Sequence, residues 1–258
     1  MNALKIEGLG IRLGGKQILS GVSFTMPRGK VVGLIGPNGA GKSTAIKCIL
    51  GLIPCTDGTV DVGDTNVAEM PPRVRAKTLA YVPQGAPVHW PLTAERTVAL
   101  GRVPHLTPWQ TLGAVDEMAI KEAMQKTDCW IFRDRLVTTL SGGERARVLL
   151  ARTLAVGADF ILADEPIAAL DPMHQLQVMD ILKAEAASGT GVLVVMHDLG
   201  LAMRTCDQLI LLHDTNVLAT GAPSEVLTDQ NLKIAFGVEV SRWQDGNILH
   251  MSPMRVVS

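Results

Sequence analysis

Aromatic residues and basic charge are both scarce in this chain. Phe, Trp and Tyr together make up 3% of the 258 residues, and the formal net charge is −1 at pH 7. Proteins that bind nucleic acids use basic surfaces to neutralise phosphates, and many use aromatic rings to stack on bases. The composition shows neither feature, so we expect no nucleic-acid partner.

Cysteine is also scarce, and long apolar runs are missing. The cysteines do not have the spacing of a zinc site, and one lies in an apolar segment expected to be helical, so we expect a reduced cytosolic protein without disulfides or zinc. No run reaches the roughly 18 apolar residues that span a bilayer, and residues 1–10 lack the features of a secretory signal. The cysteines are Cys48, Cys55, Cys129 and Cys206.

Hydrophobic residues are plentiful, at 47% of the chain, which is enough for a sizeable core. Residues 4–54 and 56–82 have the patterns and turn signals of strands, whereas 85–140 is mainly helical. From residue 148 onward strands and helices alternate, which is typical of a parallel α/β sheet. Residues 236–258 form a short β segment in this reading. The expected helices of the middle region lie at 93–102, 112–126 and 130–136.

A glycine-rich loop is the most specific feature of the chain. It joins a buried strand expected at 31–35 to a helix expected at 44–50, which is the context in which G-x-x-x-x-G-K-[ST] binds phosphate. Its glycines permit positive φ, so that successive N–H groups point inward as an anion site. Lys42 is expected to contact the β- and γ-phosphates, and the Ser43 hydroxyl to bind Mg²⁺. The expected phosphate-binding residues are Gly36, Pro37, Asn38, Gly39, Ala40, Gly41, Lys42, Ser43 and Thr44.

Polar side chains follow two further apolar runs. Asp164 and Glu165 come directly after 160–163, and His197 follows 192–196. In an open α/β sheet the carboxyl ends of the strands face the ligand crevice. We therefore expect Asp164 to bind Mg²⁺, Glu165 to polarise an attacking water, and His197 to lie beside the γ-phosphate.

Over nearly its whole length the chain resembles the nucleotide-binding subunits of ATP-binding-cassette (ABC) transporters, because six motifs of that family occur in the family's order. Alone, most of these motifs are weak signals, but six in order are highly specific. They are Walker A at 36–43, the Q-loop glutamine Gln84, the signature Leu140-Ser141-Gly142-Gly143-Glu144, Walker B at 160–164 followed by Glu165, the D-loop at 169–171, and the H-loop His197.

The resemblance implies a fold class and a division of the chain. The fold is an α/β P-loop NTPase core of the RecA-like type, with an N-terminal antiparallel β subdomain and an inserted α-helical subdomain. The ATPase domain would comprise residues 1–235, with the helical subdomain at about 85–155. Residues 236–258 would be a short C-terminal β appendage.

The resemblance also implies ATP and Mg²⁺ as cofactors, and a head-to-tail homodimer with two ATP molecules at its interface. Ser141, Gly142 and Gly143 would cap the nucleotide held by the other subunit, since they open a helix expected at 144–156. Leu13 occupies the position where an aromatic residue usually stacks on adenine. The implied catalytic residues are Glu165, His197, Lys42 and Gln84, the metal-binding residues are Ser43, Gln84 and Asp164, and Asp171 joins the nucleotide contacts.

The transporter subclass is indicated by residues 89–93 and 98–105, which resemble the ATPases of iron-siderophore, haem and cobalamin importers. Such a subunit would lie on the cytoplasmic face of the inner membrane, bind two polytopic permease subunits and work indirectly with a solute-binding protein. Uptake of molybdate or another chelate is an alternative. Non-transport ABC ATPases of DNA repair or translation are another, although they usually carry two cassettes or a long coiled-coil insertion. A GTPase would need an N-K-x-D element, which 125–128 does not match.

Overall fold

The computed structural model describes residues 3–85, 90–168, 170–246 and 248–256. At its centre lies a six-stranded sheet in the order β10-β9-β3-β8-β7-β6. Adjacent strands from β9 to β6 pair in parallel, and β10 is antiparallel to β9. The fold is therefore the α/β core expected from the sequence. The strands are β3 (Val31–Ile35), β6 (Leu79–Val82), β7 (Phe160–Asp164), β8 (Gly191–Val195), β9 (Gln208–His213) and β10 (Asn216–Gly221).

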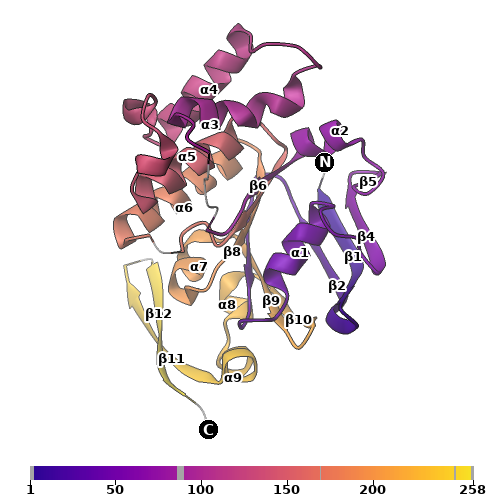
Figure 1. Ribbon diagram of the computed structural model, residues 1–258. Helices are drawn as coiled ribbons and strands as arrows, with labels where there is room; N and C mark the ends of the chain where they lie inside the picture. The colour runs from indigo at the N-terminus through magenta and orange to yellow at the C-terminus, as the bar shows by residue number, and fades with distance from the viewer. Residues whose placement is uncertain (1–2, 86–89, 169, 247, 257–258) are drawn as a thin grey trace.

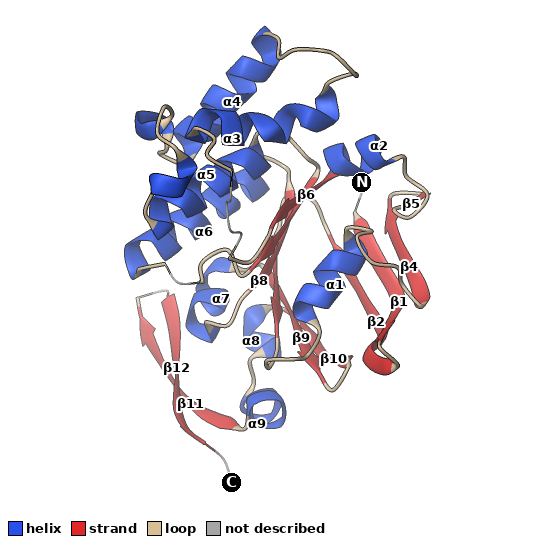
Figure 2. Ribbon diagram, in the orientation of Figure 1, coloured by secondary structure: helices blue, strands red, loops and turns tan. Residues whose placement is uncertain are grey.

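Alternating side chains of the central strands enter two different cores, one on each face of the sheet. Leu34 and Leu162 belong to the first core, whereas their strand neighbours Ile35 and Ile161 belong to the second. Because successive side chains of a strand point to opposite faces, a continuous apolar run can fill both cores. Figure 2 shows the sheet between the elements that cover its two faces.

The first core is covered by the N-terminal part of the chain. An antiparallel sheet in the order β2-β1-β4-β5 packs there together with the helix that follows the glycine-rich loop. This part also contains a short helix within 56–82, where the sequence predicted strands. A proline at its first position favours the helix, because the N–H group of the first helical residue has no partner within a helix and is not needed. The elements are β1 (Leu4–Leu13), β2 (Lys16–Met26), α1 (Lys42–Ile49), β4 (Asp57–Val62), β5 (Thr65–Asn66) and α2 (Pro72–Thr78).

A helical region with its own apolar core lies at one end of the molecule (Figure 1). It differs from the expectation at several element boundaries. The helix expected at 93–102 is α-helical only to Ala99 and continues as a 3-10 turn that contains Pro104, which has no N–H to donate. The elements are α3 (Ala94–Ala99), η1 (Leu100–His105), α4 (Ala114–Lys126), η2 (Trp130–Phe132), η3 (Val137–Thr139) and α5 (Gly142–Leu154).

The expectation of a helix at 130–136 was wrong. Only a short 3-10 turn forms, and the chain then extends beside the start of α3. The carbonyls of Arg133 and Arg135 accept from the N–H groups of Glu95 and Ala94. These carbonyls thus accept from N–H groups at the first turn of α3 that have no partner within that helix. In a helix at 130–136 the chain would not extend beside α3, and these hydrogen bonds would not form.

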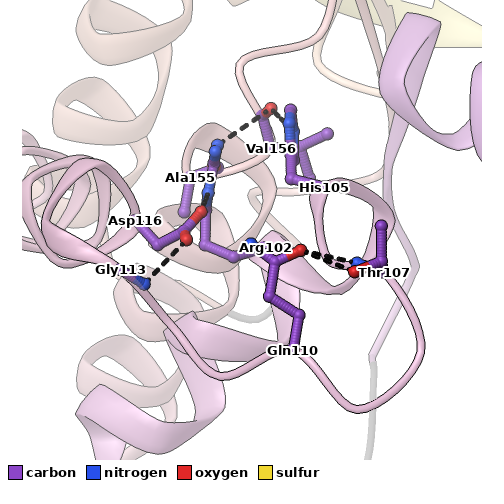
Figure 3. Close-up of polar contacts among 8 residues, drawn as sticks. All are labelled: Arg102, His105, Thr107, Gln110, Gly113, Asp116, Ala155 and Val156. Carbon is purple, nitrogen blue, oxygen red and sulfur yellow. Dashed lines mark hydrogen bonds and ion pairs between the residues drawn. The ribbon is translucent and has the colours of Figure 1, made fainter.

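Buried polar contacts hold the C-terminal end of α5 (Figure 3). Arg102 of η1 donates to the carbonyl of Ala155 at 2.7 Å and forms an ion pair with Asp116 of α4 at 2.8 Å. His105 contacts the carbonyl of Val156 at 2.8 Å. Since the last carbonyls of a helix have no partner within it, these side chains complete α5 and connect it to η1 and α4.

The second core is covered by helices of the C-terminal half of the chain and by a C-terminal hairpin. Strand β12 of the hairpin lies along α7, and Met251 is buried in this core. No helix within the described ranges is long and apolar enough to cross a lipid bilayer. The elements are α6 (Pro172–Ala187), α7 (Leu199–Thr205), α8 (Pro223–Val226), α9 (Asp229–Phe236), β11 (Val238–Asp245) and β12 (Ile248–Val256).

Candidate functional site

The glycine-rich loop connects the C-terminal end of β3 to α1, as the sequence predicted. Its glycines 36, 39 and 41 have φ values of 151°, 82° and 92°. A Cβ atom on Gly36 would lie 2.4 Å from the carbonyl oxygen of Leu212, and one on Gly41 would lie 2.8 Å from the Leu19 side chain. Both the backbone angles and the close packing therefore require glycine, and the loop leads directly into the N-terminus of a helix, which favours anions.

Lys42, the first residue of α1, is buried within this loop. Its ammonium group donates to the carbonyls of Gly36 at 2.8 Å and Pro37 at 2.9 Å. Burial lowers the pKa of Lys42, and the carboxylates of Glu165 and Asp164 act in the opposite direction. The lysine is thus a donor fixed at the loop that is expected to bind phosphates.

Ser43 and Asp164 meet across the gap between α1 and the end of β7. The Ser43 hydroxyl donates to Asp164 Oδ1 at 2.9 Å, and the Tyr81 hydroxyl lies 3.4 Å from Oδ2. Burial raises the pKa of Asp164, while the hydrogen bond from Ser43 opposes that rise. A hydroxyl and a carboxylate are oxygen ligands of the kind that Mg²⁺ prefers. The donor set therefore fits the expected metal.

Tyr81 was not among the predicted site residues. It lies on β6, directly beside Leu162 of β7 in the parallel register. Burial, the charge of Asp164 and their hydrogen bond raise the pKa of Tyr81 to about 12, so its hydroxyl stays protonated as a donor. Its position three residues before Gln84 was the available signal, but only the pairing of β6 with β7 directs it to Asp164.

Glu165 is held at both carboxylate oxygens. Gln84 Nε2 donates to Oε2 at 2.6 Å, and His197 Nε2 lies 2.5 Å from Oε1. Glu165 has a φ of 50°, a backbone conformation that is uncommon for residues other than glycine and often found at functional sites. Three side chains that follow three adjacent strands, β6, β7 and β8, thus converge. The sequence had placed Glu165 and His197 after strands that face one crevice, whereas Gln84 was expected at the site only from the family resemblance.

The signature residues begin helix α5. The Ser141 hydroxyl accepts from the N–H of Glu144 at 3.3 Å, and the Glu144 carboxylate accepts from the N–H of Ser141 at 2.8 Å. This capping box explains why α5 starts at Gly142 rather than at the expected residue 144. In the described parts of the chain, no hydrogen bond or ion pair joins 141–143 to the glycine-rich loop.

A cavity of about 290 Å³ lies between the start of α5 and the end of β7, and both Gly142 and Glu165 line it. The signature and the expected catalytic carboxylate therefore border the same hollow within one chain. Among the described residues, neither of them is joined to the phosphate loop by a hydrogen bond or an ion pair.

Asp171 caps α6. Its Oδ1 accepts from the N–H of His174 at 3.0 Å, and its Oδ2 lies 2.7 Å from the ring nitrogen Nδ1 of the same histidine. The backbone hydrogen bond from His174 lowers the pKa of Asp171, and the side-chain bond adds to this effect. His174 in turn lies beside Gly143, within about 3.4 Å of a Cβ built there. His174 was not among the predicted site residues. The available signal in the sequence was its position three residues after Asp171, which caps the helix.

Leu13 lies at the end of β1 with 47% of its surface exposed. The structure thus places the residue that the resemblance assigned to adenine on the protein surface, where it is free to contact a ligand.

Comparison with known proteins agrees with these motifs. The ABC transporter family profile matches residues 19–168. The chain is 41% identical over 239 residues to the cobalamin import ATP-binding protein BtuD of Halobacterium salinarum, covering 92% of this chain and 60% of that protein. It is 39% identical over 242 residues to the hemin import ATP-binding protein HmuV of Pseudomonas fluorescens, covering 92% and 93%.

Solved structures share the fold. A chain from a metal-chelate type ABC transporter in an inward-facing conformation superposes with a TM-score of 0.87 at 24% identity, covering 99% of this chain and 98% of that one. A dimeric ATP-binding cassette bound to ADP and Pi superposes with a TM-score of 0.74 at 26% identity, covering 85% and 98%. With its family profile, its relatives and its site geometry in agreement, the chain belongs to the ABC transporter family.

Proposed function

We propose that this chain is the ATP-hydrolysing subunit of an ABC importer. The observation that carries the proposal is the position of Glu165, whose carboxylate is held by Gln84 and His197 beside the Ser43–Asp164 pair. An acid fixed next to a hydroxyl–carboxylate metal site and a phosphate loop is the arrangement that hydrolysis of a nucleoside triphosphate requires.

The residues of this site have distinct tasks. The loop N–H groups and Lys42 bind the phosphates, with Thr44 at the first turn of α1. Ser43 and Asp164 would hold Mg²⁺ together with Gln84, and the metal would supply positive charge to the phosphate oxygens. Glu165 accepts a proton from the attacking water, while His197 keeps the carboxylate turned toward it.

The second half of each site comes from another copy of the chain. Ser141, Gly142 and Gly143 stand at the N-terminus of α5, where the helix dipole attracts anions. Nowhere in the part of the chain that the structure describes does a hydrogen bond or ion pair join them to the phosphate loop of their own chain. A head-to-tail dimer brings the two parts together, with Asp171 at the interface and Leu13 against adenine. The solved dimeric cassette of the same fold supports this arrangement.

The chain has an ATPase domain at 1–235, which includes a helical subdomain at about 85–155, and a C-terminal appendage at 236–258. The helical subdomain binds the permease. Trp90 supports this assignment, because 75% of its surface is exposed and exposed aromatic residues are frequent anchors of interfaces. We assign residues 84–92 and the helix that follows them to the permease-binding surface; of these, residues 86–89 lie outside the described ranges.

The complete importer contains two copies of this chain on the cytoplasmic face of the membrane, two permease subunits and a solute-binding protein. Its cargo is an iron chelate, haem or cobalamin. The relatives named for cobalamin and hemin import support this choice. The chain spans 60% of the length of the Halobacterium relative and 93% of the Pseudomonas relative.

The variant Glu165→Gln tests the hydrolytic role. It keeps the size and the hydrogen-bonding reach of the side chain but cannot accept a proton, so ATP turnover should fall by about 10²–10⁴-fold. Binding of ATP should persist. The matched control is Glu122→Gln, an exposed change on α4 that should leave turnover unchanged. Turnover of Glu165→Gln close to that of the wild type would show that another group is the base.

The transport role is tested by co-expression with permease subunits of the cobalamin or hemin import type. The purified complex in vesicles should accumulate haem, cobalamin or an iron chelate only with ATP, and the Glu165→Gln complex should not. If the complex hydrolyses ATP but takes up none of these compounds, the proposed ATPase activity stands and the proposed cargo is wrong.

A further inference from the structure

Two cysteines lie side by side in the fold, although their spacing in the sequence is not that of a metal site. Cys48 is on the last turns of α1, and Cys55 is in the loop that leads from α1 to β4. Their sulfur atoms are 2.7 Å apart. The sequence had indicated reduced cysteines without disulfides or zinc. The other two, Cys129 and Cys206, are buried in the other two cores.

The backbone keeps this pair together. Gly51 follows the C-terminal cap of α1; its φ is 66°, and its N–H donates to the carbonyl of Cys48 at 2.8 Å. The residue after Cys55, Thr56, donates its N–H to the carbonyl of Gly10 on β1 at 2.8 Å. Both thiols therefore sit on chain segments fixed by hydrogen bonds, and their proximity does not depend on side-chain rotation alone.

The two thiols differ in access. Cys48 is 2% exposed and belongs to the first core, whereas Cys55 is half-buried and packs at its edge. Burial raises the pKa of Cys48, and the neighbouring thiol raises it further. Since thiolates are the nucleophiles, Cys55 is the thiol that an external reagent reaches, and Cys48 is the one that reacts second.

A cavity of about 470 Å³ opens beside the pair and is lined by both cysteines, Pro54, Asn66 and Arg75. The guanidinium of Arg75 lies over Gly51, 2.7 Å from where a Cβ would stand. A small anionic reagent can thus approach Cys55 next to a positive charge, outside the nucleotide site.

We infer that Cys48 and Cys55 form a reactive dithiol site, which a low-molecular-weight disulfide such as oxidised glutathione converts to an intrachain disulfide. The Cys55 thiolate attacks the reagent, the reagent's S–S bond breaks, and one thiolate leaves. Cys48 then attacks the mixed disulfide at the Cys55 sulfur, and its proton goes to the second departing thiolate. The two cysteines lose two electrons and two protons, and the oxidant becomes two thiols.

Closing the bond shortens the distance between the two sulfur atoms from 2.7 Å to about 2.0 Å. Lys42 and Ser43 lie at the opposite end of α1, so the phosphate loop should keep its shape. The oxidised chain should therefore bind ATP with an affinity within about threefold of the reduced chain, and its unfolding midpoint should rise because the crosslink restricts the unfolded state.

The experiment treats the reduced full-length chain with oxidised glutathione and then determines its mass and its free thiols after denaturation. The wild type should lose two thiols without gaining a glutathione, and a peptide containing both cysteines should be crosslinked. Cys48→Ser should instead stop at a stable glutathione adduct on Cys55. Cys55→Ser should remain reduced at Cys48, and Cys129→Ser should close the bond as the wild type does.

Retention of all free thiols in the wild type would overturn the inference. So would a glutathione adduct that persists in the wild type, or a crosslink to Cys129 or Cys206. Loss of ATP binding in the crosslinked chain would overturn the claim that the phosphate loop keeps its shape. None of these outcomes depends on whether the chain hydrolyses ATP, so they are independent of the proposed function.

Discussion

Single side chains set the chemistry at the edge of the central sheet. The Glu165 carboxylate contacts Gln84 through one oxygen and His197 through the other. Each of these three residues follows a different strand, so a small shift of one strand against the next would separate them. The positive φ of Glu165 shows that the backbone accepts an uncommon conformation to aim this side chain.

The side chain at position 13 should limit the affinity for ATP. Leu13→Tyr adds a ring able to stack on adenine, which contributes roughly 1–3 kcal/mol per base. Leucine already supplies apolar contact, so the gain should be smaller, up to about tenfold in Kd. Equilibrium binding of a fluorescent ATP analogue would measure it. Leu100→Tyr, at an equally exposed site in the helical region, should change nothing. Equal affinities of Leu13→Tyr and the wild type would show that adenine is bound elsewhere.

At the scale of elements, the N-terminus of α5 has a pH-dependent cap. The backbone hydrogen bond from Ser141 lowers the pKa of Glu144 below its ordinary value of 4.5. A carboxyl whose pKa is lower in the folded state stabilises the fold above its unfolded pKa, and this stabilisation is lost as the pH falls through the folded pKa. Glu144→Gln should therefore reduce the free energy of unfolding by about 0.3–1 kcal/mol at neutral pH.

Denaturant unfolding of both proteins across pH would test this prediction. The difference between them should be constant at neutral pH and should shrink as the pH falls below 4.5. Glu122→Gln, in the middle of α4, should show no such trend. A difference between wild type and Glu144→Gln that stays the same down to acid pH would mean that Glu144 stabilises α5 without its charge.

The other end of α5 depends on a residue of η1. Arg102→Leu would leave the carbonyl of Ala155 without its donor, and an unsatisfied buried carbonyl costs about 1–3 kcal/mol. The free energy of unfolding should fall by at least that amount, because Asp116 loses its ion pair as well. Thermal and denaturant unfolding would measure the loss. Arg96→Leu, at an exposed position of α3, is the control, and equal stability of both variants would show that Arg102 does not hold the helix.

At the scale of the whole molecule, the nucleotide site should be complete only in a dimer. Ser141→Arg and Lys42→Ala should each abolish ATPase activity alone. A mixture should regain activity, because each mixed dimer combines the intact phosphate loop of one subunit with the intact signature of the other. Two different affinity tags would confirm that mixed dimers form. Activity in purified mixed dimers no higher than in either variant alone would show that both motifs act within one chain.

Much of this architecture follows from local features of the sequence. The apolar runs that form β3, β7 and β8 are continuous because both faces of each strand are buried. The glycine-rich loop was recognisable because its backbone angles tolerate few other residues. The short turn at 130–132 was not predictable, since carbonyls from 133 and 135 serve the N-terminus of α3, a contact between distant segments.

The sequence by itself determined the family, the phosphate loop and the polar residues that end three strands, because each is encoded by neighbouring residues with fixed backbone requirements. Only the tertiary structure decided which of those residues meet. The strand order β8-β7-β6 brings His197, Glu165 and Gln84 together, and the same packing directs Tyr81 to Asp164. The tertiary structure also brings Cys48 next to Cys55, because the helix end and the next loop are held by hydrogen bonds that no local pattern reveals.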